Sequence, residues 1–257
     1  MRDKLNNKIK AILFDLDGTL LDVELDNFIS QYLELLAQSI AHIVPPKKFI
    51  SKIIKASKAI EENNRKHLNE DIYSKVCFPL DGYSRKEIQP FLDKFYENDY
   101  SKLRKWTRRK PEARAVVQTV FDKGYDVVIA TTPLLPATAI EQRLEWAGVA
   151  DFPYRLITTI ENSHATKSLT HLLYYDQILD KIGYPPETCL MVGDEDKDMI
   201  AKRLGVKTFL ITGREKELSP NIPEPTYKGS LYELKFLIQF IFIIFIFQSI
   251  SKLILLI

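Results

Sequence analysis

The sequence predicts an α/β fold, in which a parallel β-sheet core carries helices on both faces and an all-helical segment is inserted after the first strand. Two observations lead to this prediction. From residue 110 onwards, short apolar runs alternate with longer amphipathic segments, as in successive strand–helix units. Between residues 22 and 109 glycine nearly vanishes and apolar residues recur every three or four positions, which is typical of helices.

The first strand is expected at Ala11–Phe14, because a continuous apolar run suits a strand that is covered on both faces. It is followed by Asp15, Asp17, Gly18 and Thr19. Ligands of parallel sheets lie beyond the carboxyl ends of the strands, and two adjacent carboxylates are costly to bury without a cation. The pattern therefore favours a functional site. A calcium loop and a simple polar turn are the alternatives.

Residues 22–109 are expected to contain helices and no strand. Pro45-Pro46 separates a first helix from a second one, and Pro79 with Asp81-Gly82 marks another break. After the first, the predicted helices cover residues 47–63, 69–76 and 85–100.

Strands and helices alternate after Lys110-Pro111. Each predicted helix is followed by a glycine, which suits the left-handed backbone of a helix C-cap. These helices cover residues 111–123, 136–146, 169–182 and 197–204, and the strands cover 125–130, 155–158, 189–193 and 206–211. Such units imply right-handed crossovers and a Rossmann-like parallel sheet.

Composition and missing motifs narrow the function classes. With 257 residues, 46% of them hydrophobic, the chain can form one α/β domain with a sizeable insertion, and its formal charge of +2 indicates no particular partner. Cys77 and Cys189 lack metal-binding or redox spacing, so a reducing, cytoplasmic compartment without a disulfide is expected. The N-terminus lacks the apolar core of a secretory signal. The motifs of P-loop enzymes, dinucleotide-binding enzymes, α/β-hydrolases and zinc proteases are absent.

The segment Asp15-Leu-Asp17-Gly-Thr19 resembles the first motif of the haloacid dehalogenase superfamily, D-x-D-G-T, and the similarity extends from Lys10 to Leu234. Within this superfamily the chain most resembles the phosphoglycolate-phosphatase-like hydrolases with a helical cap. The resemblance implies an α/β core of residues 1–21 and 110–230, a helical cap of residues 22–109, and a hydrophobic tail of residues 231–257.

Three further segments resemble motifs of this superfamily. Thr131 ends the second strand, where relatives use a Thr or Ser to bind the phosphoryl group, and Thr132 stands where relatives often carry Asn. Asp194 and Asp198 match a metal-binding G-D-x-x-x-D motif, although acids at a helix N-terminus are also favourable through the helix dipole. Lys167 occupies the place of a lysine that relatives carry before the helix leading to the metal-binding strand, but the proline that commonly follows that lysine is absent. A lone lysine without such a motif is usually a surface residue.

The resemblance implies a magnesium-dependent phosphomonoester hydrolase that acts on a small phosphorylated metabolite. Asp15 is the expected nucleophile, which forms an aspartyl-phosphate, and Asp17 is the expected general acid and base. Lys167 is expected to offset the repulsion between nucleophile and phosphate. The expected substrate-binding residues are Thr131, Thr132 and Lys167. The expected ligands of Mg²⁺ are Asp15, Asp17 through its backbone carbonyl, Asp194 and Asp198.

Two other functions keep the same motifs. A sugar-phosphate mutase of this fold differs only in its product. A catalytically weak phosphate-binding protein, tethered to a membrane, is favoured by the missing proline and by the tail. The basic run Lys102–Lys110 suits a solvated hinge facing an anionic substrate better than a nucleic-acid patch, because the total charge is nearly balanced.

The residues from Leu234 to Ile257 are mostly apolar, around an uninterrupted apolar run over residues 240–247. As a helix they would span about 36 Å, enough for a bilayer core of about 30 Å. Their alternating Phe and Ile residues suit an aggregation-prone strand equally well. A C-terminal membrane anchor and a self-packing tail therefore remain alternatives, and no oligomeric state is predicted.

Overall fold

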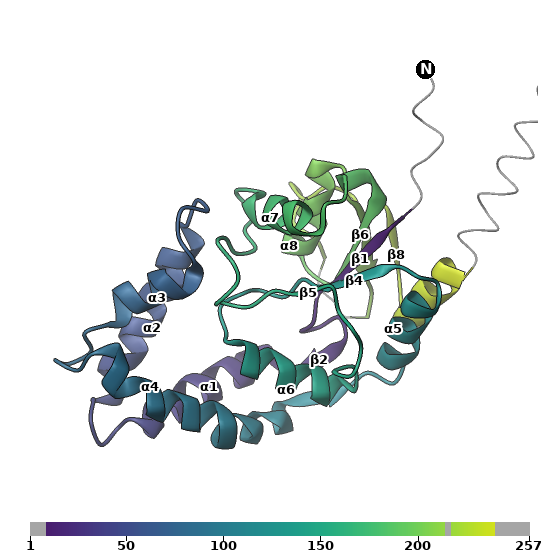
Figure 1. Cartoon of the computed structure of the whole chain (residues 1–257). Helices are drawn as coiled ribbons and strands as arrows, with labels where there is room; N and C mark the ends of the chain where they lie inside the picture. Colours follow the sequence, from purple (N-terminus) through teal and green to yellow (C-terminus); the bar gives the residue numbers. More distant parts are fainter. Residues whose placement is uncertain (1–8, 214–216, 240–257) are drawn as a thin grey trace, which may run out of the picture.

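A computed structural model of the chain describes residues 9–213 and 217–239 (Figure 1). Its centre is a six-stranded sheet in which every neighbouring pair of strands is parallel. In spatial order the strands are β5 (Leu156–Ile157), β4 (Asp126–Ile129), β1 (Ala11–Phe14), β6 (Cys189–Gly193), β7 (Lys207–Ile211) and β8 (Tyr227–Gly229). The predicted parallel α/β fold is therefore confirmed.

Helices cover both faces of this sheet (Figure 1). On one face, Ile12 and Phe14 pack with α5 (Ala113–Asp122) and α6 (Ala137–Ala147). On the other face, Ala11 and Leu13 pack with α7 (Leu173–Ile182) and with the 3₁₀ helix Ile200–Leu204, which follows α8 (Asp196–Met199). Because successive side chains of a strand point to opposite faces, the short apolar run of β1 contributes to both cores.

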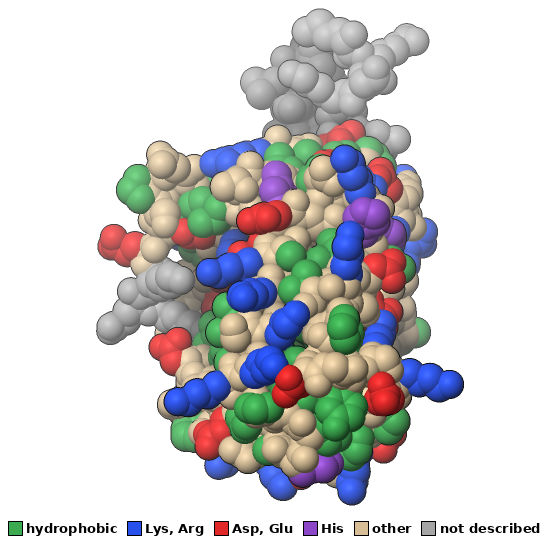
Figure 2. All heavy atoms as spheres, turned by 90° about the vertical axis from the view of Figure 1, so that its left-hand side faces the viewer, with side chains coloured by type: hydrophobic (Ala, Val, Ile, Leu, Met, Phe, Trp, Pro, Cys, Tyr) green, Lys and Arg blue, Asp and Glu red, His purple; other side chains and the backbone are tan. Residues whose placement is uncertain are grey.

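A helical segment, residues 25–106, is inserted between two short strands, β2 (Leu21–Val23) and β3 (Thr107–Arg109), which lie outside the six-stranded sheet. Its elements are α1 (Leu25–Ser39), α2 (Pro46–Glu61), α3 (Asn69–Cys77), α4 (Arg85–Lys94), a π-helical turn (Phe95–Asp99) and a 3₁₀ helix (Tyr100–Trp106). In Figure 1, α2 and α3 lie at the left, apart from the sheet. Figure 2 shows that side of the molecule, where lysine and arginine side chains form a band.

The expectation that residues 22–109 contain no strand was wrong at both ends. β2 and β3 pair as an antiparallel ribbon, in which Asp22 lies opposite Arg108 and the two side chains form an ion pair of 2.8 Å. Each strand has three residues and its partner is distant in sequence, so neither produces a visible alternation. β8, equally short, was not predicted either.

Several helix ends also differ from the prediction. The helix expected over residues 85–100 is α-helical only to Lys94 and continues as the π-helical and 3₁₀ turns. The helix expected over residues 169–182 begins at Leu173, which leaves residues 158–172 without a helix or strand. The predicted glycine caps are confirmed at Gly148 and Gly183, whose φ angles are +73° and +72°.

The C-terminal part of the described chain is a helix over residues 231–239, which buries Leu231, Leu234 and Ile238 in the same core as α5. Residues 240–257, most of the apolar tail, lie outside the described residues. No helix within residues 9–213 and 217–239 has the length and apolar character needed to cross a membrane. Cys77 and Cys189 are both buried and free, as expected.

Aromatic side chains fix the helical segment to α6. Tyr100 stacks on Trp146, with ring centroids 5.6 Å apart and an interplanar angle of 20°, and Phe28 meets Trp146 edge-on. All three side chains are buried. Stacked and edge-on aromatic pairs add to the stability that burial alone provides, so this cluster holds the helical segment against the α/β core.

We expect Trp146→Ala to lower the free energy of unfolding by about 3–5 kcal/mol, because it leaves a cavity between the helical segment and α6. Urea unfolding followed by circular dichroism measures this change. Tyr232→Ala, which removes an exposed ring, is the control and should stay within about 0.5 kcal/mol of the original protein. Equal losses in the two variants would show that the cluster does not anchor the segment.

Candidate active site

The order of the strands brings three predicted site residues to one edge of the sheet. β1 lies between β4 and β6, so Asp15, Thr131 and Asp194 follow three neighbouring parallel strands. The ladder continues past β1, since the amide of Asp15 donates to the carbonyl of Val192 at 2.9 Å. Ligand sites of open parallel sheets lie at this carboxyl edge.

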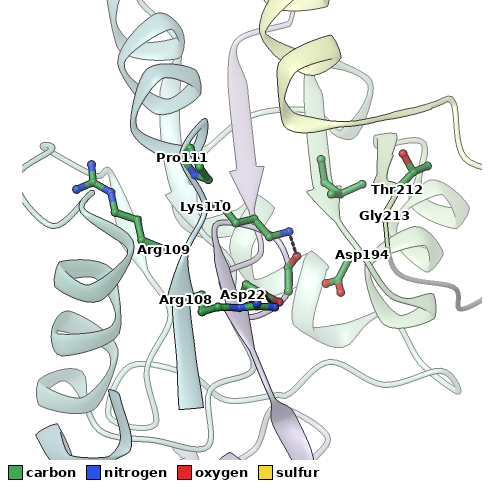
Figure 3. A pocket seen from close by; sticks show the side chains of 10 residues that line it. Asp22, Arg108, Arg109, Lys110, Pro111, Asp194, Thr212 and Gly213 are labelled. Carbon is green, nitrogen blue, oxygen red and sulfur yellow. Dashed lines mark hydrogen bonds and ion pairs between the residues drawn. The ribbon is translucent and has the colours of Figure 1, made fainter. Parts of the chain in front are cut away.

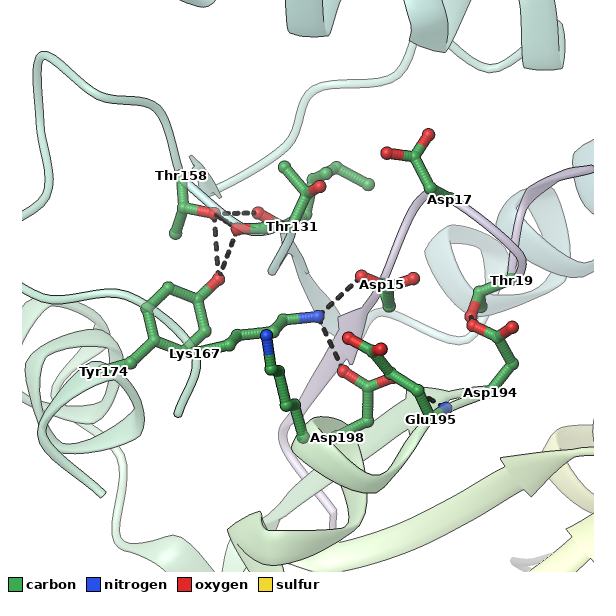
Figure 4. Close-up of polar contacts among 12 residues, drawn as sticks. Asp15, Asp17, Thr19, Thr131, Thr158, Lys167, Tyr174, Asp194, Glu195 and Asp198 are labelled. Atoms are coloured by element: carbon green, nitrogen blue, oxygen red, sulfur yellow. Dashed lines mark hydrogen bonds and ion pairs between the residues drawn. The ribbon is translucent and has the colours of Figure 1, made fainter. Parts of the chain in front are cut away.

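Lys167 reaches the same place from the loop between β5 and α7 (Figure 4). Its Nζ lies 2.5 Å from Oδ1 of Asp15 and 2.6 Å from Oδ1 of Asp198. The lysine is 1% exposed and Asp198 is fully buried. Burial alone lowers the pKa of Lys167, but the two carboxylates outweigh it and raise this pKa well above its usual value. The lysine is therefore a fixed buried cation and not a surface side chain.

The loop that carries Lys167 is tied to the helical segment. Asn69, the first residue of α3, is fully buried. Its side-chain Nδ2 donates to the carbonyl of Ala165 at 3.1 Å, and its backbone N–H donates to the carbonyl of Ser163 at 2.8 Å. On the other side, the hydroxyl of Tyr174 donates to the carbonyl of Thr131 at 2.8 Å. These contacts hold the lysine in place without the proline that relatives commonly have.

Asp194 and Asp198 differ in their surroundings. Asp198 accepts from Lys167 through Oδ1 and from the amide of Glu195 through Oδ2 at 3.3 Å. Burial raises the pKa of Asp198 well above its usual value, and Lys167 opposes that shift. Oδ1 of Asp194 accepts from the hydroxyl of Thr19 at 3.3 Å. A Cβ at Gly18, whose φ is +90°, would lie 2.2 Å from the carboxylate of Asp194, so only glycine allows this approach.

The donor set at this edge fits a magnesium ion. One carboxylate oxygen from each of Asp15, Asp194 and Asp198 can be chosen so that all lie within 4.8 Å of one another. Hard oxygen ligands of this kind are those that Mg²⁺ prefers. The edge gathers these ionisable side chains: Asp15, Asp17, Asp194, Asp198, Arg143 and Lys167.

Figure 4 shows that Asp17 points away from Lys167. Its carboxylate forms an ion pair with Arg143 of α6. The guanidinium is almost fully buried, while the side chain of Asp17 is 23% exposed. Burial raises the pKa of Asp17, and the adjacent Arg143 limits that rise. Oδ1 of Asp17 and Nε and Nη2 of Arg143 have no hydrogen-bond partner among the described residues.

Sequence reasoning missed Arg143. The signal was present, because this arginine interrupts the apolar stripe of α6 formed by Ile140, Leu144 and Ala147. An arginine buried within such a stripe needs an anionic partner. The sequence does not reveal that this partner is the second aspartate of the first motif, 126 residues earlier.

A cavity of about 920 Å³ opens above this edge, between the sheet and the helical segment. Asp15, Asp17, Thr131, Thr132 and Asp194 all line it. The structure therefore brings the predicted substrate-binding threonines to the same space as the carboxylates, and Lys167 and Asp198 lie directly beneath it.

The end of the basic run Lys102–Lys110, residues Arg108, Arg109 and Lys110, lines a second, smaller cavity of about 390 Å³ (Figure 3). Lys110 donates to the carbonyl of Gly18, in the turn that follows Asp17. The guanidinium of Arg109 lies against Gly148, where a Cβ would be 2.4 Å from it, and Arg108 pairs with Asp22. Lys110 therefore connects the return crossing to the site loop. The interpretation of the run as a solvated hinge facing an anionic substrate stays a prediction.

Comparison with known proteins places this geometry in context. The family model for haloacid dehalogenase-like hydrolases matches residues 9–203, more than half of the chain. The chain is 25% identical over 222 residues to a phosphoglycolate phosphatase of Aquifex aeolicus, covering 85% of this chain and 92% of that protein. It is 24% identical over 214 residues to the pyrophosphatase PpaX of Oceanobacillus iheyensis, covering 81% and 86%. A solved structure of a HAD phosphatase from Thermococcus onnurineus has the same fold, with a TM-score of 0.54, 19% identity, and coverage of 88% and 96%.

We expect Arg143→Met to lower the free energy of unfolding by about 3 kcal/mol or more, because it leaves Asp17 partly buried beside no cation. Adding Asp17→Asn to this variant should recover part of the loss, since the remaining side chain is then neutral. Urea unfolding of the two single variants and the double variant measures the coupling. If the double variant loses the sum of the two single losses, the ion pair does not stabilise the fold.

Proposed function

Since the chain belongs to the haloacid dehalogenase-like hydrolases, we propose that it is a phosphatase that hydrolyses the phosphomonoester of a small metabolite with the aid of Mg²⁺. Two of its relatives are named as a phosphoglycolate phosphatase and a pyrophosphatase, which supports phosphate chemistry. Residues 1–21 and 110–230 would form the catalytic core, and residues 22–109 would form a cap over it.

One observation carries this proposal. Asp15 ends the central strand at the ligand-binding edge and lines the large cavity, while its carboxylate contacts a buried ammonium group at 2.5 Å. A buried carboxylate held beside a fixed cation at the base of a cavity is suited to meet an anionic substrate. A purely structural ion pair would not need the cavity above it.

In the proposed reaction, a carboxylate oxygen of Asp15 attacks phosphorus and forms an aspartyl-phosphate, and the ester oxygen leaves. Lys167 lies beside the attacking oxygen and reduces the repulsion between the two anions. Thr131, which lines the cavity next to Asp15, is placed to donate to a phosphoryl oxygen. Water then cleaves the aspartyl-phosphate and restores Asp15.

Asp17 is assigned the proton transfers. Because its pKa is raised, Asp17 stays protonated to a higher pH than an ordinary aspartate does. This suits a group that donates a proton to the leaving oxygen. The resulting carboxylate can then accept a proton from the attacking water. Oδ2 of Asp17 is held by Arg143, whereas Oδ1 is buried and has no hydrogen-bond partner among the described residues.

A metal ion would be held by Asp15, Asp194 and the backbone carbonyl of Asp17, with Asp198 nearby. When bound, Mg²⁺ would neutralise charge on the phosphoryl oxygens. The carboxylate of Asp198 already accepts two hydrogen bonds, from Lys167 and Glu195. Its main task would then be to hold Lys167 in position.

The full-length protein should release phosphate from p-nitrophenyl phosphate in the presence of Mg²⁺ and stop when EDTA is added. Asp15→Asn should lower this rate by at least about a thousandfold, since it removes the nucleophile. A phosphate-release assay with both proteins checks this expectation, and Asp71→Asn, an exposed acid of α3, is the matched control. Full activity of Asp15→Asn, or activity that EDTA does not change, would contradict the proposal.

Asp17→Asn should affect substrates according to their leaving groups. p-Nitrophenolate leaves without a proton, so this variant should still produce one rapid turnover of p-nitrophenol and then stall as the phosphorylated enzyme. With ethyl phosphate the first step itself should slow by about a hundredfold or more, because ethoxide needs the proton. Rapid-quench measurements of the first turnover separate the two steps. Equal slowing of the first step with both esters would exclude Asp17 as the acid.

A further inference from the structure

Part of the wall that the helical segment contributes to the large cavity is apolar. Leu25 and Ile29 of α1 and Ile54 of α2 line it and are 46%, 46% and 45% exposed. Large apolar side chains are usually covered, and these three line the same cavity as the carboxylates of the proposed phosphate site. They border the space that the rest of a bound ester would occupy.

The aromatic residues of the cavity add to this apolar surface. Tyr32 and Tyr96 line it, and their hydroxyl groups lie 2.8 Å apart and hydrogen-bond to each other. Because each hydroxyl already has a partner, the rings contribute mainly their apolar faces. Phe28, which is buried, continues this wall towards Trp146.

The charges that line the cavity do not favour a second anionic group on the substrate. Of the arginines in the lining, Arg143 is paired with Asp17 and Arg85 with Glu70. Two lysines, Lys58 and Lys197, also line the space, together with further acids: Glu61, Asp93, Glu97, Glu161 and Glu195. Because acids outnumber bases in this lining, the cavity disfavours a carboxylate beyond the phosphate.

We propose that the substrate is the monophosphate ester of an uncharged alcohol with a sizeable apolar or aromatic portion, which packs on Leu25, Ile29 and Ile54. This inference rests on the proposed phosphatase activity and specifies its substrate class. It separates this chain from an enzyme for phosphoglycolate, whose leaving group is small and carries a carboxylate. A cavity of about 920 Å³ is large for such a leaving group and suits a bulkier one.

The test uses the full-length protein, Mg²⁺ and a matched series of esters: ethyl, butyl and hexyl phosphate, and hexyl phosphate with a terminal carboxylate. We expect kcat/KM to rise about tenfold or more from ethyl to hexyl phosphate, because each added methylene group buries apolar surface. The carboxylated hexyl ester should lose most of this gain. The gain should appear mainly as a lower KM.

The double variant Ile29→Asn, Ile54→Asn should flatten the dependence on chain length. Tyr83→Ser removes an exposed ring of the same segment that does not line the cavity, and it should keep the dependence. If all esters react but chain length has no effect, or the carboxylated ester is preferred, the inference is wrong and the phosphatase proposal stands. If no ester releases phosphate, both fail.

Discussion

A single buried ammonium group constrains much of this structure. Lys167 lies between Asp15 and Asp198, and a charge buried to this degree is tolerated only while both carboxylates stay close to it. Three elements must therefore keep their positions: the end of β1, the loop before α7 and the start of α8. The hydrogen bonds from Asn69 to that loop extend the requirement to the helical segment. The electrostatics of the site and the packing of the fold are thus parts of one arrangement.

The connection between the sheet and the helical segment passes directly beside the site. β2 begins two residues after Thr19, so the turn that contains Gly18 serves both the carboxylates and the ribbon that carries the segment. Lys110 at the return crossing holds the same turn from the other side. Asp17 lies within it and is also held by Arg143, next to the aromatic cluster of Tyr100 and Trp146. A movement of the helical segment would therefore act on the turn that carries Asp17 and, through Asn69, on the loop that carries Lys167.

Local patterns predicted much of the fold. β1, β4, β6 and β7 are apolar runs long enough to recognise, and Gly148 and Gly183 end helices in the left-handed conformation that glycine favours. β2, β3 and β8 were missed because strands of three residues have almost no periodicity and depend on distant partners. In the site, the carboxylates and Thr131 could be placed together because parallel strands end at one edge. Lys167 could be assigned to the site because its position resembles a family motif. Arg143 could not, because the sequence does not show which face of α6 meets Asp17.

The site has two parts, which come from different elements. One part carries residues that match the motifs of the family, and the other part is formed by residues of this chain that match no motif. The carboxylates, Thr131 and Lys167 come from the sheet edge and its loops, where charge and hydrogen bonding leave little freedom. The wall opposite them comes from α1 and α2. In these helices the fold requires apolar residues only on the faces that pack in the core. Ile29 and Ile54 are not required by that core, since half of each side chain remains exposed. Their apolar character, in a cavity where acids outnumber bases, suits the class of ester that we propose as substrate, and relatives with about 25% identity need not share it.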